Sequence, residues 1–187
     1  MNDMIHSIIG TRKLAFGGAV FAGLMRIVPH PPNFTPAGGL AIYSGARLSG
    51  WRAFATPLVM MVVSGLILSW MHGYSFWSSI TAVVLLSFGV YVLFGKLLRN
   101  TENPLAIGGV TIAGSVQFFL ITNFAVWALA GYYPPTAAGL LACYVAAIPF
   151  FGAPLLGDLF YSAALFTAHH FLARSFFPDE VVPAAAA

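Results

Sequence analysis

Several of the residues that could do chemistry in this chain lie in or beside a proline-rich stretch, PHPPNFTP at positions 29–36. Each proline ring fixes φ and biases the preceding residue towards extended geometry, so we predict a stiff loop between two apolar segments. The loop and its approach place Arg26, His30 and Asn33 close together in a chain that has few polar side chains. We interpret the loop as one wall of a small-molecule site at the mouth of a bundle of membrane helices. For His30, a hydrogen-bonded role within the loop is the alternative to a ligand contact.

Asp158 is the only acidic residue inside a predicted membrane helix. It follows Gly157 at the start of the last helix, where the helix dipole favours a carboxylate. Ionised residues within a membrane are costly and are usually paired, line a cavity or have a functional role. We expect Arg26 to be the partner of Asp158 and Tyr161, one turn later, to share the site. The alternative is a capping aspartate in a salt bridge that fixes the first helix against the last.

Asn123 and Trp127 are four residues apart and therefore share one face of the predicted fifth helix. An amide beside an indole near the outer surface would suit a flat polar ligand. The alternative for Trp127 is the aromatic belt of the membrane interface. The resulting prediction of substrate-binding residues is Arg26, His30, Asn33, Asn123, Trp127, Asp158 and Tyr161.

No motif in the sequence indicates catalysis, a metal site or a cofactor. The segment GVYVLFGK (89–96) is one residue too long for a phosphate-binding loop and lies in an apolar helix. His169 and His170 are adjacent, so on a helix they point about 100° apart and are poorly placed to share a metal ion. Cys143 is the only cysteine, which excludes an internal disulfide and a CxxC motif. We therefore predict that the protein is not an enzyme.

The composition is that of an integral membrane protein. The chain is 59% hydrophobic and 7% charged, with a mean hydropathy of +0.87, whereas a soluble domain contains about 25% charged residues. The basic residues are spread over several loops without a basic patch, so no nucleic-acid partner is implied. A membrane span requires about 20 apolar residues, and the apolar length predicts an all-α, six-helix transmembrane bundle that forms a single domain over residues 1–187.

The predicted spans are separated by polar or proline-containing turns. Residues 136–150 are interrupted by Pro149, followed closely by Gly152 and Pro154, so we predict a short helix or re-entrant segment on the outer side there. The six spans are expected at residues 8–28, 37–48, 54–71, 77–98, 105–130 and 155–173.

The positions of the basic residues orient this bundle. With six spans, both termini and the even-numbered connections lie on one side, which receives every lysine and arginine except Arg26. By the positive-inside rule that side is the cytoplasm. The proline-rich loop and residues 131–157 then lie on the outer side, near most of the unusual polar residues.

A stripe of small residues, Ala15, Ala19 and Gly23, recurs at every fourth position of the first helix. Such a stripe lets a neighbouring helix approach closely. The neighbour is either another helix of the same bundle or a separate membrane subunit that docks there.

Two segments resemble a bacterial family of membrane transport proteins of undetermined function. They are PHPPNFTPAGGLAIYSGA (29–46) and TNFAVWALAGYYPPTAAGLLACYVAAIPFFGAPLLGDLFYSAALF (122–166). That family is related to the substrate-binding S components of energy-coupling factor (ECF) transporters, and the loop and the LLGDLFY segment (155–161) carry the resemblance most specifically.

The resemblance implies a six-helix subunit of the bacterial inner membrane, with both termini cytoplasmic, that binds a vitamin or similar micronutrient at its outer face for uptake. It further implies that the stripe on the first helix docks a membrane coupling subunit driven by ATPases. A corrinoid is one candidate ligand, with His30 or Cys143 as a candidate cobalt ligand. The alternative function is a structural or accessory subunit of a larger membrane complex with no small-molecule ligand.

Overall fold

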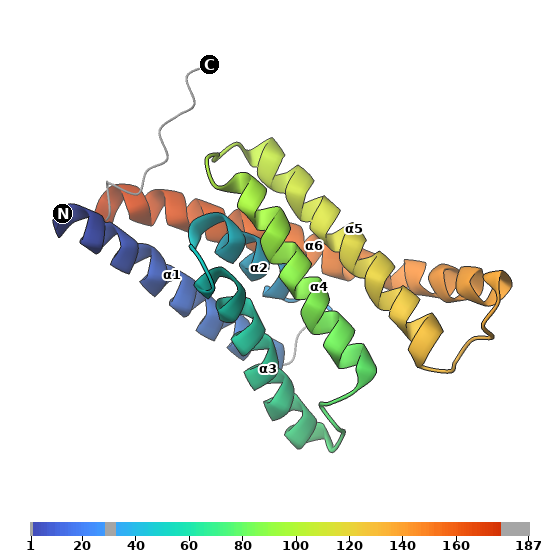
Figure 1. Ribbon diagram of the computed structural model, residues 1–187. Coiled ribbons are helices and arrows are strands. Elements are labelled where there is room, and N and C mark those ends of the chain that lie inside the picture. Colours follow the sequence, from blue (N-terminus) through green and yellow to red (C-terminus); the bar gives the residue numbers. More distant parts are fainter. Residues whose placement is uncertain (1, 29–32, 177–187) are drawn as a thin grey trace.

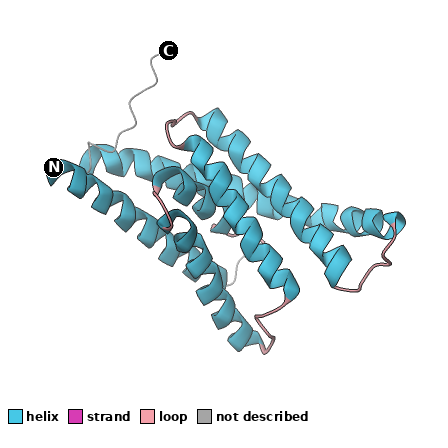
Figure 2. Cartoon of the chain, in the orientation of Figure 1, coloured by secondary structure: helices cyan, strands magenta, loops and turns pink. Residues whose placement is uncertain are grey.

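The computed structural model describes residues 2–28 and 33–176, and all regular structure in these two segments is helical (Figure 2). This confirms the all-α prediction. The elements are α1 (Asn2–Ile27), α2 (Ala37–Arg47), α3 (Arg52–His72), α4 (Ser79–Gly95), the 3-10 turn η1 (Lys96–Leu98), α5 (Pro104–Leu129) and α6 (Ala137–Phe176).

The helices form a bundle whose connections alternate between two ends (Figure 1). The start of α1, the α4–α5 connection and the last turns of α6 lie towards one end, whereas the α3–α4 and α5–α6 connections lie towards the other. Helix α1 packs against α2, α3 and α6, and α5 packs between α4 and α6.

Four helices of the described chain are long and apolar enough to cross a membrane. Large apolar side chains also cover the outside of the bundle, and Trp70 and Leu105 are each 85% exposed. An apolar surface of this extent is a liability in water but suits a lipid environment. The structure therefore supports a membrane protein. The four helical segments are Arg52–His72, Ser79–Leu98, Pro104–Leu129 and Ala137–Leu172.

Helix α2 lies at the centre of the bundle and packs against all five other α-helices (Figure 1). Every residue from Ala37 to Ala46 is buried. Its 11 residues extend about 16 Å at 1.5 Å per residue, roughly half of the 30 Å hydrocarbon core of a bilayer. The predicted second span at 37–48 is thus helical where expected, but it is a short core helix and does not by itself have the length of a span.

Helices α2 and α4 cross with their backbones in contact. A Cβ atom on Gly45 would collide with the carbonyl oxygen of Val92, and one on Gly95 would collide with the carbonyl oxygen of Ile42. Only glycine allows two helix backbones to approach so closely. This crossing fixes the central helix against the wall that carries Tyr91, one turn before Gly95.

The prediction of a break before the last span is wrong. Residues 137–176 form one continuous helix, α6, that contains Pro149 and Pro154. Each proline removes one hydrogen bond to residue i−4, and membrane helices tolerate such residues because neighbouring groups satisfy the freed carbonyls. Forty residues extend about 60 Å, about twice the thickness of the hydrocarbon core, so α6 is either steeply tilted or projects beyond it.

Replacing Arg47 with alanine is expected to destabilise the bundle by about 2 kcal/mol, the scale of hydrogen bonds made by a charged group. Its guanidinium donates to the carbonyl oxygens of Leu98 (3.1 Å), Arg99 (3.3 Å) and Thr101 (3.1 Å), which ties α2 to the α4–α5 connection. Thermal unfolding in detergent measures the effect. Arg52→Ala, at an exposed position, is the control, and equal melting temperatures for the two variants would contradict this role.

Candidate functional site

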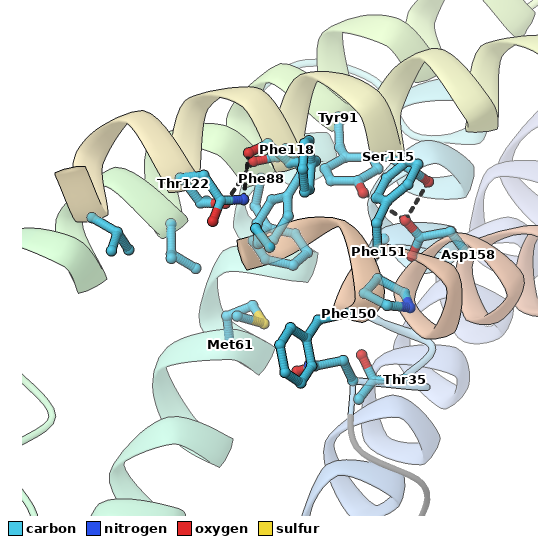
Figure 3. Close-up of a pocket in the computed structure, with 18 of the residues that line it drawn as sticks. Thr35, Met61, Phe88, Tyr91, Ser115, Phe118, Thr122, Phe150, Phe151 and Asp158 are labelled. Atoms are coloured by element: carbon cyan, nitrogen blue, oxygen red, sulfur yellow. Dashed lines mark hydrogen bonds between the residues drawn. The ribbon is translucent and has the colours of Figure 1, made fainter. Parts of the chain in front are cut away.

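A cavity of about 680 Å³ lies between α3, α4, α5 and α6 and extends to the end of α1 and the start of α2 (Figure 3). It occupies the half of the bundle that is farther from the first turns of α1 and the last turns of α6. Aromatic rings make up much of its wall, together with a few polar side chains. The rings are those of Phe88, Tyr91, Phe118, Phe119, Tyr133, Phe150 and Phe151, and the other polar side chains are those of Arg26, Asn33, Thr35, Ser115, Thr122, Asn123 and Asp158.

Asp158 is held in the cavity wall by donors from three other helices. The hydroxyl of Tyr91 in α4 donates to its Oδ2 at 2.5 Å, and the hydroxyl of Ser115 in α5 donates to the same atom at 2.7 Å (Figure 3). The backbone N–H of Gly38 in α2 also donates to the carboxylate. Asp158 is 5% exposed, so this carboxylate joins four helices at the base of the cavity.

The Gly38-Gly39 pair makes that arrangement possible. A Cβ atom on Gly38 would overlap the carboxylate of Asp158, and one on Gly39 would lie 2.7 Å from the backbone nitrogen of Ser162. The first turn of α2 can therefore lie directly on α6 only because both positions lack a side chain.

Arg26 lines the same cavity, but it does not pair with Asp158 as predicted. Its Nη1 donates to the sulfur of Met61 at 2.8 Å, and its buried Nε has no hydrogen-bond partner. Within the described segments, the only ion pair is formed by His170 and Glu102. Asp158 does not need Arg26 as a structural partner because neutral donors already satisfy most of its acceptor positions.

The two predicted asparagines also line the cavity. Asn33 adopts a left-handed conformation with φ of 63°, which asparagine tolerates better than most residues. The side-chain amide of Asn123 donates to the carbonyl of Phe119 in its own helix at 2.8 Å. Cys143 lies beside it, with its sulfur 3.4 Å from the carbonyl oxygen of Asn123.

Two predicted site residues point elsewhere. The indole of Trp127 donates to the carbonyl of Pro134 in the following loop at 3.0 Å. Tyr161 packs between Phe21 and Phe34, with ring centroids 6.4 and 5.6 Å away. A residue three positions after Asp158 is rotated by about 60° around the helix, and this turns Tyr161 away from the cavity. His30 lies outside the described residues.

Tyr91 and Ser115 line the cavity and bind Asp158, but the sequence did not lead us to predict either of them as a site residue. A lone hydroxyl residue in an apolar helix gives little signal by itself. The signal lies in spacing: Ser87 and Tyr91 are four residues apart, as are Thr111 and Ser115. Each pair marks one polar helix face, and all four side chains are buried.

The small-residue stripe of α1 lines a second groove, an apolar one of about 660 Å³ between α1 and α3. Ala15 is 1% exposed, and the nearest atom to a Cβ built on Gly23 belongs to Met60 of α3, at 3.7 Å. Ala15 is thus buried within the bundle and Gly23 lies beside α3, while all three residues of the stripe also line the groove.

The two adjacent histidines at the other end of α6 have separate partners. His169 is hydrogen-bonded to the hydroxyl of Tyr43 at 2.9 Å, and His170 pairs with Glu102 at 2.7 Å. No group of three His, Cys, Asp or Glu side chains in the described part of the chain could hold a metal ion. These histidines thus connect α6 to α2 and to the α4–α5 connection.

Tyr91→Phe is expected to cost about 2 kcal/mol of stability, because it removes a hydrogen bond to a charged acceptor. Tyr144→Phe is the matched control: that hydroxyl donates to the neutral carbonyl of Leu120 at 2.7 Å, a bond whose loss costs about 1 kcal/mol. Chemical or thermal denaturation in detergent measures the loss of stability of each variant. A larger loss for Tyr144→Phe would show that the hydroxyl of Tyr91 does not hold a charged Asp158.

Residues 10–184 match the profile of a protein family described as a family of unknown function (DUF6580), and the chain belongs to that family. No curated protein and no solved structure matches the chain.

Proposed function

We propose that this DUF6580 protein is a membrane subunit that binds a vitamin or similar micronutrient at its outer face for uptake. The observation that carries the proposal is the cavity, whose lining combines polar groups from five helices and the proline-rich loop with aromatic rings.

The size and lining of the cavity support a small organic ligand. Its volume of about 680 Å³ falls within the roughly 300–1,000 Å³ of typical ligand pockets, which combine apolar walls with a few placed polar groups. Phe88, Phe118 and Phe151 supply aromatic rings to the lining of the cavity, and Asn33 and Asn123 supply side-chain amides. This lining favours a compact ring system over a corrinoid, which is much larger.

The proposed topology is that of a six-pass protein of the bacterial inner membrane with both termini in the cytoplasm. The positive-inside rule supports this orientation, and the cavity then opens towards the outer side. The resemblance to ECF S components supports a membrane coupling subunit with ATPases as the partner. The apolar groove between α1 and α3, which includes Ala19 and Gly23, is the proposed docking surface.

Thermal-shift screening of the detergent-purified protein against vitamins, including a corrinoid, tests the proposal. We expect one ligand to raise the melting temperature of the wild type and of Ala168→Trp, which changes an exposed position outside the cavity. The same ligand should have no effect on Ala147→Trp, because Ala147 lines the cavity and the indole would obstruct it. Loss of uptake of that vitamin on gene deletion is the second expected result.

The opposite outcome favours the alternative function. If no compound shifts the melting temperature, deletion leaves uptake unchanged, and a stoichiometric protein partner covers the outer face, the chain is an accessory subunit of a larger membrane complex.

A further inference from the structure

We propose that the ligand of this cavity is a zwitterion, with an anionic group that binds Arg26, a cationic N–H group that binds Asp158, and a flat apolar part between them. The inference rests on the proposed function and names the chemical class of its ligand. It follows from two opposite charges that line one cavity without neutralising each other.

The first charge is the carboxylate of Asp158. A carboxylate offers about four acceptor positions, and the hydroxyls of Tyr91 and Ser115 and the N–H of Gly38 occupy three of them. All three donors are neutral, and none of the described cations lies within ion-pair distance of the carboxylate. Asp158 therefore keeps one acceptor position free, and a cationic N–H group of a ligand placed there would pair with the ionised carboxylate.

The second charge is the guanidinium of Arg26, which is poorly satisfied by the protein. A guanidinium has five N–H donors, and a thioether sulfur is a weak acceptor, yet the sulfur of Met61 is the acceptor that the described structure provides. The Nε atom is buried without a partner. A carboxylate or phosphate would offer the strong, paired acceptors that a guanidinium prefers.

The two charges lie on different sides of the cavity. Arg26 is anchored at Met61 of α3, whereas Asp158 is anchored at Tyr91 of α4 and Ser115 of α5. Figure 3 shows Met61 and Asp158 well apart in the cavity. A ligand with one charge would leave the other protein charge unpaired in a medium of low dielectric constant, which is costly. A zwitterion satisfies both.

Matched sets of probes test this assignment. 4-(Aminomethyl)benzoate, 4-methylbenzylamine and 4-methylbenzoate share one ring but carry a charge at each end, only the cation, or only the anion; 4-(2-aminoethyl)benzoate, 4-methylphenethylamine and 4-ethylbenzoate form a second set. Dissociation constants are measured by titration calorimetry in detergent alongside the vitamin panel. We expect the zwitterion of at least one set to bind the wild type at least 10-fold more tightly than both of its singly charged analogues.

Two variants, one for each charged side chain, test which part of the ligand each side chain binds. Asp158→Asn should bind the zwitterion no more tightly than the anionic probe. Arg26→Gln should bind the zwitterion no more tightly than the cationic probe. The affinity of Asp158→Asn for the anionic probe should stay within about threefold of the wild-type value. The same limit applies to the affinity of Arg26→Gln for the cationic probe. Loss of the cooperative thermal transition identifies a variant that has lost its fold, and the other variant then decides.

The outcomes separate this inference from the proposed function. If a singly charged or neutral compound from either panel binds more tightly than every zwitterion, the inference is wrong and the proposed function stands. If no compound in either panel binds, both are wrong. If both variants lost affinity for all three probes of a set to the same extent, the charge assignment would also be overturned.

Discussion

Asp158→Ala is expected to destabilise the protein by at least about 3 kcal/mol, because it leaves three buried donors without an acceptor and each orphaned group costs about 1–3 kcal/mol. Those donors belong to Tyr91, Ser115 and Gly38, so the substitution loosens α2, α4 and α5 from α6 together. For a chain of this length such a loss lowers the melting temperature by roughly 6–12 °C. Thermal unfolding in detergent, followed by circular dichroism, measures it.

Asp158→Asn is the control for that result. The hydroxyls of Tyr91 and Ser115 can accept as well as donate, so an asparagine amide can keep the network connected after a change of hydrogen-bond direction. We expect less than half of the destabilisation caused by alanine. If both variants lost the same amount of stability, or if the alanine variant were as stable as the wild type, Asp158 would not connect the helices in the way we describe.

Gly95→Ala is expected to have the second largest effect. A Cβ atom at this position would collide with the carbonyl oxygen of Ile42 in α2, and a helix backbone cannot move aside as a flexible side chain can. Overpacking of a well-packed interior typically costs about 1–3 kcal/mol, and the upper end applies here because α2 contacts every other α-helix. The melting temperature should fall by several degrees, roughly 2–4 °C per kcal/mol.

Gly89→Ala in the same helix provides the comparison. A Cβ atom at Gly89 would meet nothing within 4 Å, and alanine favours a helix over glycine by roughly 0.5–1 kcal/mol. This variant should be as stable as the wild type or slightly more stable. If Gly95→Ala behaved in the same way, the close crossing of α2 and α4 would be refuted.

The sequence predicted the helices well where apolar length and turn residues agree. The predicted segments 54–71 and 105–130 differ by one or two residues at each end from α3 (Arg52–His72) and α5 (Pro104–Leu129). Hydropathy alone could not reveal the role of α2, because a buried core helix and a short span have the same composition. Its burial depends on the paired glycines Gly45 and Gly95, whose partners become visible only in three dimensions.

Prolines were the main source of error in the last third of the chain. Pro149 and Pro154 predicted a break, since proline ends most helices in soluble proteins. Inside α6 each removes one hydrogen bond and leaves the rest of the helix intact. The packing of α6 against α5 favours continuity, and such packing cannot be read from the local sequence.

Part of the site was predictable from the scarcity of polar residues in an apolar chain. Arg26, Asn33, Asn123 and Asp158 line one cavity, as the tendency of polar groups in a membrane to face a cavity suggests. Trp127 was misplaced because a neighbouring loop carbonyl accepts its N–H.

The identity of the donors to Asp158 could not be predicted, because it depends on how four helices rotate about their axes. Tyr91 and Ser115 are 67 and 43 residues from Asp158 in the sequence. Contacts over such distances require a knowledge of packing that hydropathy does not provide.

The most direct test of the account is to identify the small molecules that co-purify with the protein from its native membranes, by mass spectrometry, for the wild type, Ala147→Trp and Ala168→Trp. We expect one stoichiometric compound in the wild type and in Ala168→Trp, and none in Ala147→Trp, in which the indole obstructs the cavity. The same compounds in all three proteins, or no compound in any, would contradict a ligand site at this cavity.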